Sequence, residues 1–259
     1  MTDGRRKFIK IAALAALGGG RCILSATSAL AAGTGSATGS PGKKRLGLVV
    51  DVGRCMEQGG CRDCIDACHA AHNVPEIPDK RREVRWIAKE PWEKVFSDVN
   101  TEFTPGWLRQ ASVLVMCNHC EHPPCVRVCP TQATWKRASD GVVMMDLHRC
   151  IGCRYCLAAC PFGARNFHFM DPRPYIKNPH DGFPTATKGV VDKCNLCAER
   201  LDKGLLPACV TACRQKGVAA LAFGDLDDAN SEVSRMLASR LALRRRAELG
   251  TGCNVFYAV

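Results

Sequence analysis

The chain has 259 residues, a formal net charge of +11 and 18 cysteines, and only 6% of its residues are aromatic. This length accommodates one large or two small domains, and no apolar stretch is long enough to span a bilayer, so we expect no transmembrane helix. A core with so few aromatic side chains would be small. We therefore expect bound metal to act as an internal cross-link whose loss unfolds the protein.

The first segment, residues 1–31, has the features of a twin-arginine export signal. Arg5 and Arg6 precede the apolar stretch 11–17, and a small-residue cleavage site ends at Ala31. A membrane anchor is the alternative, but the apolar stretch is too short to cross a bilayer. We therefore expect export to the periplasm, with thiols already committed to metal, followed by a flexible linker over 32–44.

Short strands and helices are predicted over 45–223, and a strand, a cysteine loop and a short helix recur in order. The predicted elements are a strand at 46–52, a helix at 61–72, a strand at 113–116, a hairpin of 134–136 and 142–145, and strands at 167–169 and 219–223. The fold class expected is α+β, with tandem ferredoxin-like dicluster domains, an insertion lobe and a C-terminal helix.

Two further segments accompany this domain. The insertion 74–110 carries three of the four tryptophans, and it is either a lobe that covers the cluster domain or a face for a partner subunit. The segment 224–259 is predicted to be a helical extension, because apolar residues recur at helical spacing over 231–249 before Gly250.

Sixteen of the 18 cysteines fall into four quartets. The third has the spacing C-x2-C-x2-C-x3-C-P of a bacterial ferredoxin, in which three thiolates hold one 4Fe-4S cluster and the fourth reaches a neighbouring cluster. The quartets are Cys55, Cys61, Cys64 and Cys68; Cys117, Cys120, Cys125 and Cys129; Cys150, Cys153, Cys156 and Cys160; and Cys194, Cys197, Cys209 and Cys213. We expect these thiolates to bind four 4Fe-4S clusters, and the longer gap after Cys55 makes the first quartet the least regular.

Zinc is the alternative metal, because paired C-x2-C knuckles are common tetrahedral zinc ligands. The spacing of the third quartet argues against it, since zinc ribbons usually supply two pairs. The fourth quartet leaves zinc more open, because eleven residues separate Cys197 from Cys209. A c-type haem is not indicated, because Cys64 and Cys68 before His69 are one residue too far apart for C-x-x-C-H.

The positive charge also fits bound clusters. Residues 1–31 contain five basic and one acidic side chain, so their removal would lower the charge from +11 to +7. Four oxidised clusters would contribute roughly −8, which leaves the holoprotein near neutral. We therefore expect no nucleic-acid partner. The run 244–246, three arginines, is either a solvated face or a docking surface.

Several motifs resemble those of a known family. Cys117-Asn118-His119-Cys120, Pro123-Pro124-Cys125 and Pro207-Ala208-Cys209-Val210 are similar to the four-cluster ferredoxin subunits of membrane redox complexes, including polysulfide reductase and dimethyl sulfoxide reductase. More narrowly, the stretches 68–75 and 83–87 and the ending 250–257 resemble the periplasmic iron-sulfur subunit of the membrane complex associated with dissimilatory sulfite reductase.

The resemblance implies crossed ligation, in which the last cysteine of each quartet binds the cluster of its partner quartet. The implied ligand sets are Cys55, Cys61, Cys64 and Cys213; Cys194, Cys197, Cys209 and Cys68; Cys117, Cys120, Cys125 and Cys160; and Cys150, Cys153, Cys156 and Cys129. Cys253 lies outside the quartets and is expected to be a free thiol. Local hydrogen bonds are expected for His69, His119 and His122. The alternative is that these histidines tune or gate the clusters.

These observations lead to three hypotheses for function. The first is an electron-transfer subunit of a membrane-attached sulfur-metabolism complex, with a quinone-interacting membrane subunit, other redox subunits and a multihaem cytochrome as candidate partners. The second is the small subunit of a periplasmic molybdopterin oxidoreductase, and the third is a zinc-stabilised interaction protein. No active site is expected in this chain, because a fully thiolate-ligated cluster has no open iron position.

Overall fold

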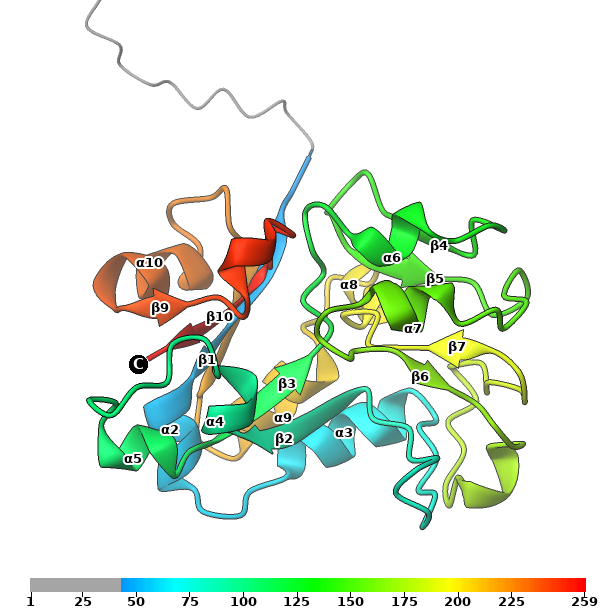
Figure 1. Cartoon of the computed structure of the whole chain (residues 1–259), viewed down its shortest axis with the longest axis horizontal. Helices are drawn as coiled ribbons and strands as arrows, with labels where there is room; N and C mark the ends of the chain where they lie inside the picture. The colour runs from blue at the N-terminus through cyan, green and yellow to red at the C-terminus, as the bar shows by residue number, and fades with distance from the viewer. Residues whose placement is uncertain (1–42) are drawn as a thin grey trace, which may run out of the picture. The chain divides into compact units, whose positions relative to one another are not determined.

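A computed structural model describes residues 43–259 as short helices and strands joined by cysteine-bearing loops (Figure 1). The predicted signal at 1–31 and nearly all of the predicted linker lie outside the described residues. The elements are β1 (Leu46–Asp51), α2 (Val52–Glu57), α3 (Asp63–Ala71), β2 (Ile87–Pro91), α4 (Trp92–Val95), α5 (Gly106–Arg109), β3 (Ser112–Met116), α6 (Pro124–Arg127), β4 (Thr134–Lys136), β5 (Val143–Met145), α7 (Tyr155–Ala159), β6 (Asn166–Phe167), η1 (Arg173–Tyr175), β7 (Val191–Asp192), α8 (Ala198–Leu201), α9 (Ala208–Gln215), β8 (Leu221–Asp225), α10 (Glu232–Ser239), β9 (Ala242–Leu243), η2 (Ala247–Leu249) and β10 (Val255–Ala258).

The largest sheet joins the two ends of the described chain. Its strand order is β8-β1-β10-β9, and β1 pairs in parallel with β10, so that the blue and red strands of Figure 1 run side by side. Leu48, Val49 and Val50 of β1 are fully buried, as expected for a central strand covered on both faces. Helix α10 packs on one face through Val233, and the main hydrophobic core covers the other.

Two pairs of short helices bring distant quartets together. Helix α3 packs against α9, and α6 packs against α7. The first pair joins segments that carry the first and fourth quartets, whereas the second pair joins the second and third (Figure 1). Three two-stranded antiparallel sheets, β2-β3, β4-β5 and β6-β7, flank these helices. The predicted α+β class is confirmed, and the predicted hairpin is present as β4 and β5.

The insertion 74–110 packs its aromatic side chains inward. Trp92 stacks on Phe96 with ring centroids 4.3 Å apart, and Phe96 meets Tyr257 of β10 edge to face at 5.1 Å. All three side chains are at most 1% exposed, whereas Phe103 and Trp107 are exposed. The insertion thus contributes to the same core as the central sheet. No helix among residues 43–259 is long and apolar enough to cross a membrane.

The predicted C-terminal helix over 231–249 is wrong beyond Ser239. Helix α10 is capped by the Ser231 side chain and ends where Arg240 adopts an extended conformation. The following residues form β9, and β10 then occupies the centre of the sheet next to β1. Helical periodicity could not reveal this pairing, because it depends on a strand roughly two hundred residues earlier in the chain.

Truncation of Tyr257 is expected to destabilise the fold. Tyr257→Ala would remove a fully buried aromatic side chain from the centre of the sheet, which typically costs about 3–5 kcal/mol. Chemical denaturation of the anaerobically purified protein measures this loss. The control is Leu241→Ala, whose side chain is 69% exposed and which should change stability by less than about 0.5 kcal/mol. Equal stability of the two variants would contradict the central placement of β10.

Candidate functional site

Three cysteines of the second quartet line a cavity together with one from the third. Cys117 directly follows β3, Cys125 lies in α6, and Cys160 caps the C-terminal end of α7. With Cys120, these side chains surround one cavity, which is closed by apolar residues and by Arg165. Pro124 at the start of α6 suits a position where a helix has no backbone partner for its N–H. Four thiols therefore converge on one space.

The first quartet forms a similar site with a cysteine from the fourth. Cys55 of α2, Cys61 and Cys64 of the loop and helix that follow, and Cys213 of α9 line one cavity. Burial raises the pKa of Cys64 to about 12, and the nearby Cys55 and Cys213 sulfurs act in the same direction. Lys89 of β2 also lines this cavity, and its charge opposes the rise in the pKa of Cys64.

The fourth quartet surrounds the last cysteine of the first. Burial raises the pKa of Cys68 well above its usual value, and the Cys194, Cys209 and Cys197 sulfurs raise it further. Sulfur atoms this close together repel one another as thiolates. The loop that carries Cys197 turns sharply, because Leu196 and Cys197 both have left-handed backbone conformations, with φ of 57° and 54°.

The third quartet forms the most exposed site. Cys150 and Cys156 lie near Cys125 in one small apolar cluster, whereas Cys153 is exposed. Its loop requires glycine at position 152, where φ is +68° and a Cβ atom would clash with the carbonyl oxygen of Gly189. Cys129 is half-buried, and its sulfur lies 3.7 Å from the hydroxyl of Thr131 on its own loop.

Backbone N–H groups point at the cysteine sulfurs. The donors are Val191 to Cys150 at 3.4 Å, Leu196 to Cys194 at 3.4 Å, Ala208 to Cys197 at 3.2 Å and Ala220 to Cys213 at 3.3 Å. All 17 cysteines of the described residues are free thiols. Converging thiols with N–H donors behind them suit a metal cluster held by thiolates, because hydrogen bonds to sulfur stabilise its negative charge.

The four sites adjoin one another in a fixed order. Besides burial, Cys64 contributes to the raised pKa of Cys209, Cys117 to that of Cys194, and Cys125 to that of Cys156. The series therefore runs from the first-quartet site to the fourth, then the second, and ends at the third. Its two ends are the less buried sites, with Cys55 and Cys61 half-buried at one end and Cys153 exposed at the other.

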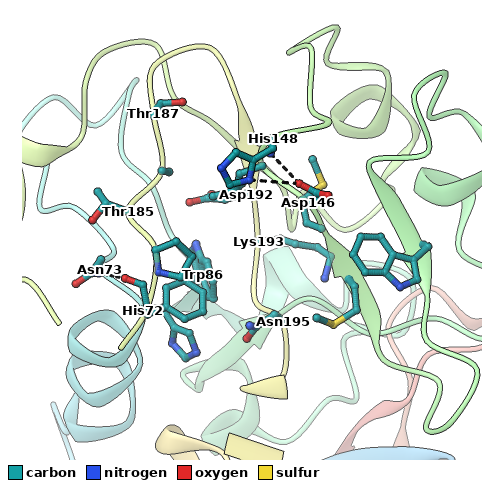
Figure 2. Close-up of a pocket in the computed structure, with 17 residues that line it drawn as sticks. His72, Asn73, Trp86, Asp146, His148, Thr185, Thr187, Asp192, Lys193 and Asn195 are labelled. Carbon is teal, nitrogen blue, oxygen red and sulfur yellow. Dashed lines mark hydrogen bonds and ion pairs between the residues drawn. The ribbon is translucent and has the colours of Figure 1, made fainter. Parts of the chain in front are cut away.

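A larger cavity of about 470 Å³ lies beside this series (Figure 2). None of its lining residues is a cysteine. His72 stacks on Trp86 at 4.7 Å and makes hydrogen bonds to the Cys68 carbonyl at 2.8 Å and to Glu199 at 2.9 Å. Burial lowers the pKa of His72, but the Cys197 sulfur and the Glu199 carboxylate outweigh it and raise the pKa to about 9. His72 thus belongs to the surroundings of the fourth-quartet site.

Sequence reasoning missed several polar residues around the sites and made no prediction about where the Cys253 side chain lies. His72, Arg165 and Lys193 are buried among the cysteines, and their only sequence signal is proximity to a cysteine or to its proline. His119 is buried and its Nδ1 accepts a hydrogen bond from Val143 N–H at 3.1 Å. Cys253, predicted only as a free thiol, is buried against the Cys120 thiol.

Comparisons with known proteins agree with this arrangement. Residues 111–171 match a family described as a 4Fe-4S dicluster domain. The chain is 43% identical over 235 residues to the Hdr-like menaquinol oxidoreductase iron-sulfur subunit 1 of Archaeoglobus fulgidus, and the match covers 83% of this chain and 84% of the relative. It is 36% identical to Protein NrfC of Escherichia coli (97% and 93% covered) and 35% identical to a tetrathionate reductase subunit of Salmonella typhimurium (85% and 74% covered).

The expected 4Fe-4S chemistry is thereby confirmed, whereas the narrower resemblance to the subunit associated with dissimilatory sulfite reductase is not shown by these relatives. The matched domain favours iron-sulfur clusters over zinc. The chain belongs to the family of ferredoxin-type 4Fe-4S iron-sulfur subunits of oxidoreductases.

Proposed function

We propose that this chain is the electron-transfer subunit of a membrane-attached sulfur-metabolism complex and carries single electrons between a quinone-interacting membrane subunit and other redox subunits. The observation that carries this proposal is the continuous series of four cysteine sites, buried in the middle and more open at both ends. Bound 4Fe-4S clusters would supply one-electron transfer there. The protein supplies thiolates, N–H donors to sulfur and a core that excludes water.

Crossed ligation is part of this proposal. The helix pairs α3–α9 and α6–α7 support it, because they carry the last cysteine of one quartet to the first three of another. Cys213 lies with the first quartet, Cys160 with the second, and Cys68 with the fourth. Cys129 would complete the third-quartet site.

The choice of a sulfur-metabolism complex rests on the sequence motifs at 68–75, 83–87 and 250–257. The menaquinol oxidoreductase relative supports a quinone-linked membrane partner. The second candidate is the small subunit of a periplasmic molybdopterin oxidoreductase; the tetrathionate reductase relative supports it only as a subunit of another reductase. In either case the twin-arginine pattern supports export of the folded, cluster-loaded chain, because that route avoids exposing free thiols to an oxidising compartment.

The third-quartet end has the properties of a partner-docking surface. We define the Cys153 face as the exposed residues Arg149, Ile151, Cys153, Arg154 and Tyr155. Ile151 and Tyr155 are 67% and 61% exposed, which is unusual for neighbouring apolar side chains unless a partner covers them. The two arginines beside them favour a redox subunit with an acidic docking surface.

Metal analysis tests the cofactor assignment. Anaerobically purified protein is expected to hold about sixteen iron atoms per chain, four for each 4Fe-4S cluster. Cys156→Ser should remove or convert one cluster, because serine is a poor ligand for iron in these sites. Cys253→Ser is the comparison, since it replaces a buried thiol that belongs to no quartet and contacts only the second-quartet site at Cys120, so it should leave the third-quartet cluster intact. Stoichiometric zinc with little iron would contradict the proposed electron transfer through 4Fe-4S clusters.

Charge reversal tests the Cys153 face. The double variant Arg149→Glu with Arg154→Glu should exchange electrons with subunit-free membranes about tenfold more slowly, or slower still, at low ionic strength. The reason is that opposite charges speed the encounter between this face and its partner. The rate is measured by stopped-flow bleaching of the clusters on mixing with membranes that lack the native subunit. Arg81→Glu, an exposed arginine in another loop, is the control. Equal rates for all three proteins would contradict docking at this face.

Isolation of the complex tests the partners. Mild detergent extraction and affinity purification of the tagged chain from its native membranes should recover a polytopic quinone-interacting subunit together with sulfite-reductase-associated proteins. Recovery of a molybdopterin subunit would replace the leading proposal with the second candidate. A chain that purifies alone from freshly prepared membranes would count against both.

A further inference from the structure

Two buried cations lie among the cysteines and have no carboxylate partner within residues 43–259. Lys193 and Arg165 are only 2% and 6% exposed. The nearby carboxylates Asp140 and Asp192 pair with other side chains, namely Arg137 and His168. A buried cation is costly unless an opposing charge lies close to it. The charge that would balance both cations is the anionic cluster of the second-quartet site.

We propose that Lys193 and Arg165 raise the reduction potential of the cluster held by the second quartet, which makes it the most easily reduced of the four. This inference rests on the proposed function in one respect, namely that the quartets hold 4Fe-4S clusters. Reduction adds one electron to a cluster that is already negative, and a nearby buried cation favours the more negative state.

Lys193 links the second and fourth sites. It follows β7 and immediately precedes Cys194, and its ammonium donates hydrogen bonds to the carbonyl oxygens of Val143 and, at 2.8 Å, Cys194. Val143 is itself a wall of the second-quartet cavity. Burial acts to raise the pKa of Cys117, and the charge of Lys193 is among the causes that lower it.

Arg165 lies between the second and third sites. It lines the second-quartet cavity, and its guanidinium donates hydrogen bonds to Thr134 Oγ1 at 2.8 Å and to Met145 Sδ at 3.3 Å. Arginine keeps its charge at any pH a protein tolerates. Burial lowers the pKa of Arg165, but the Cys125 and Cys156 sulfurs outweigh it and raise that pKa, which reflects how close they lie.

A neutral donor completes the surroundings of this site. Because His119 Nδ1 accepts the hydrogen bond from Val143 N–H, the proton of the neutral ring is carried by Nε2. Within the described residues, the buried Nε2 has no hydrogen-bond partner, although the side chain lies beside Cys117. Its N–H is therefore free to donate to a cluster bound at this site, which would also favour the reduced state.

At the other sites the cations are fewer, paired with a carboxylate or closer to water. At the fourth-quartet site, burial and neighbouring sulfurs raise the pKa values of Cys68 and Cys209 well above their usual range. The His72 ring at that site is paired with the Glu199 carboxylate at 2.9 Å, which offsets its charge. The first-quartet site has a single lining cation, Lys89, which is only half-buried. The third site, which Arg165 also approaches, is exposed to water at Cys153. We therefore expect the cluster at the second-quartet site to have the highest reduction potential of the four.

Redox titration of the anaerobically purified full chain, followed by paramagnetic resonance, tests this inference. The second-quartet signal is identified by its change in Cys120→Ser. Arg165→Gln and Lys193→Gln should each shift that signal to a more negative midpoint, by about 59 mV or more, which is a tenfold change in the ratio of reduced to oxidised cluster for a one-electron couple. Arg165→Lys keeps the charge and should stay closer to the native midpoint. Lys203→Gln, at an exposed position, is the matched control and should leave every midpoint unchanged.

Two outcomes would overturn the inference. One is an intact second-quartet signal whose midpoint is unchanged in Arg165→Gln. The other is an equal shift in Arg165→Lys and Arg165→Gln, which would assign the residue a role in packing alone. If the Lys193→Gln variant does not hold the cluster, the midpoints of Arg165→Gln and Arg165→Lys still test the inference. Native protein without any cluster signal would instead overturn the proposed function, and the inference with it.

Discussion

Sixteen cysteines that share so small an interior can be thiolates only if something binds their charge. Seven of them, among them Cys68 and Cys209, belong to the main hydrophobic core and occupy positions that leucine or valine would fill in another protein. Burial keeps such thiols protonated by raising their pKa, and close sulfur neighbours make a thiolate costlier still. Bound iron would offset both the burial and the repulsion between sulfur atoms, because it binds the thiolate form and displaces the thiol proton. Folding, cofactor loading and proton release are therefore one coupled process.

The same constraint explains the short elements and their pairing. No helix in the described part of the chain exceeds nine residues, which is too short for stability on its own. Helices α3 and α9 lie far apart in sequence and pack together, as do the closer α6 and α7. The contacts between these helices bring the cysteine sulfur atoms together in groups, and neighbouring groups lie next to each other. The geometry that stabilises the fold is thus also the geometry that allows electrons to pass.

The sequence predicted the chemistry better than the topology. The spacing of Cys150, Cys153, Cys156 and Cys160 indicated the cofactor, because a cluster imposes its own dimensions on the ligand loop. The α+β class and the β4–β5 hairpin followed from local patterns. The position of β10 could not be predicted from local patterns, because its pairing with β1 is a long-range contact. The helical periodicity at 231–249 instead led to the prediction of a helix in this part of the chain. The buried Lys193 and Arg165 escaped notice for a similar reason, since only the fold reveals that neither side chain reaches water.

The pairing of β1 with β10 has a consequence for biosynthesis. The strand that begins the described fold finds its parallel neighbour only in Val255–Ala258, near the end of the chain. Every cysteine of the quartets precedes β10 in sequence, so the central sheet cannot close until the segment that follows the last quartet has been synthesised. Truncation before Val255 would leave one edge of β1 unpaired, and an unpaired strand edge is a template for aggregation.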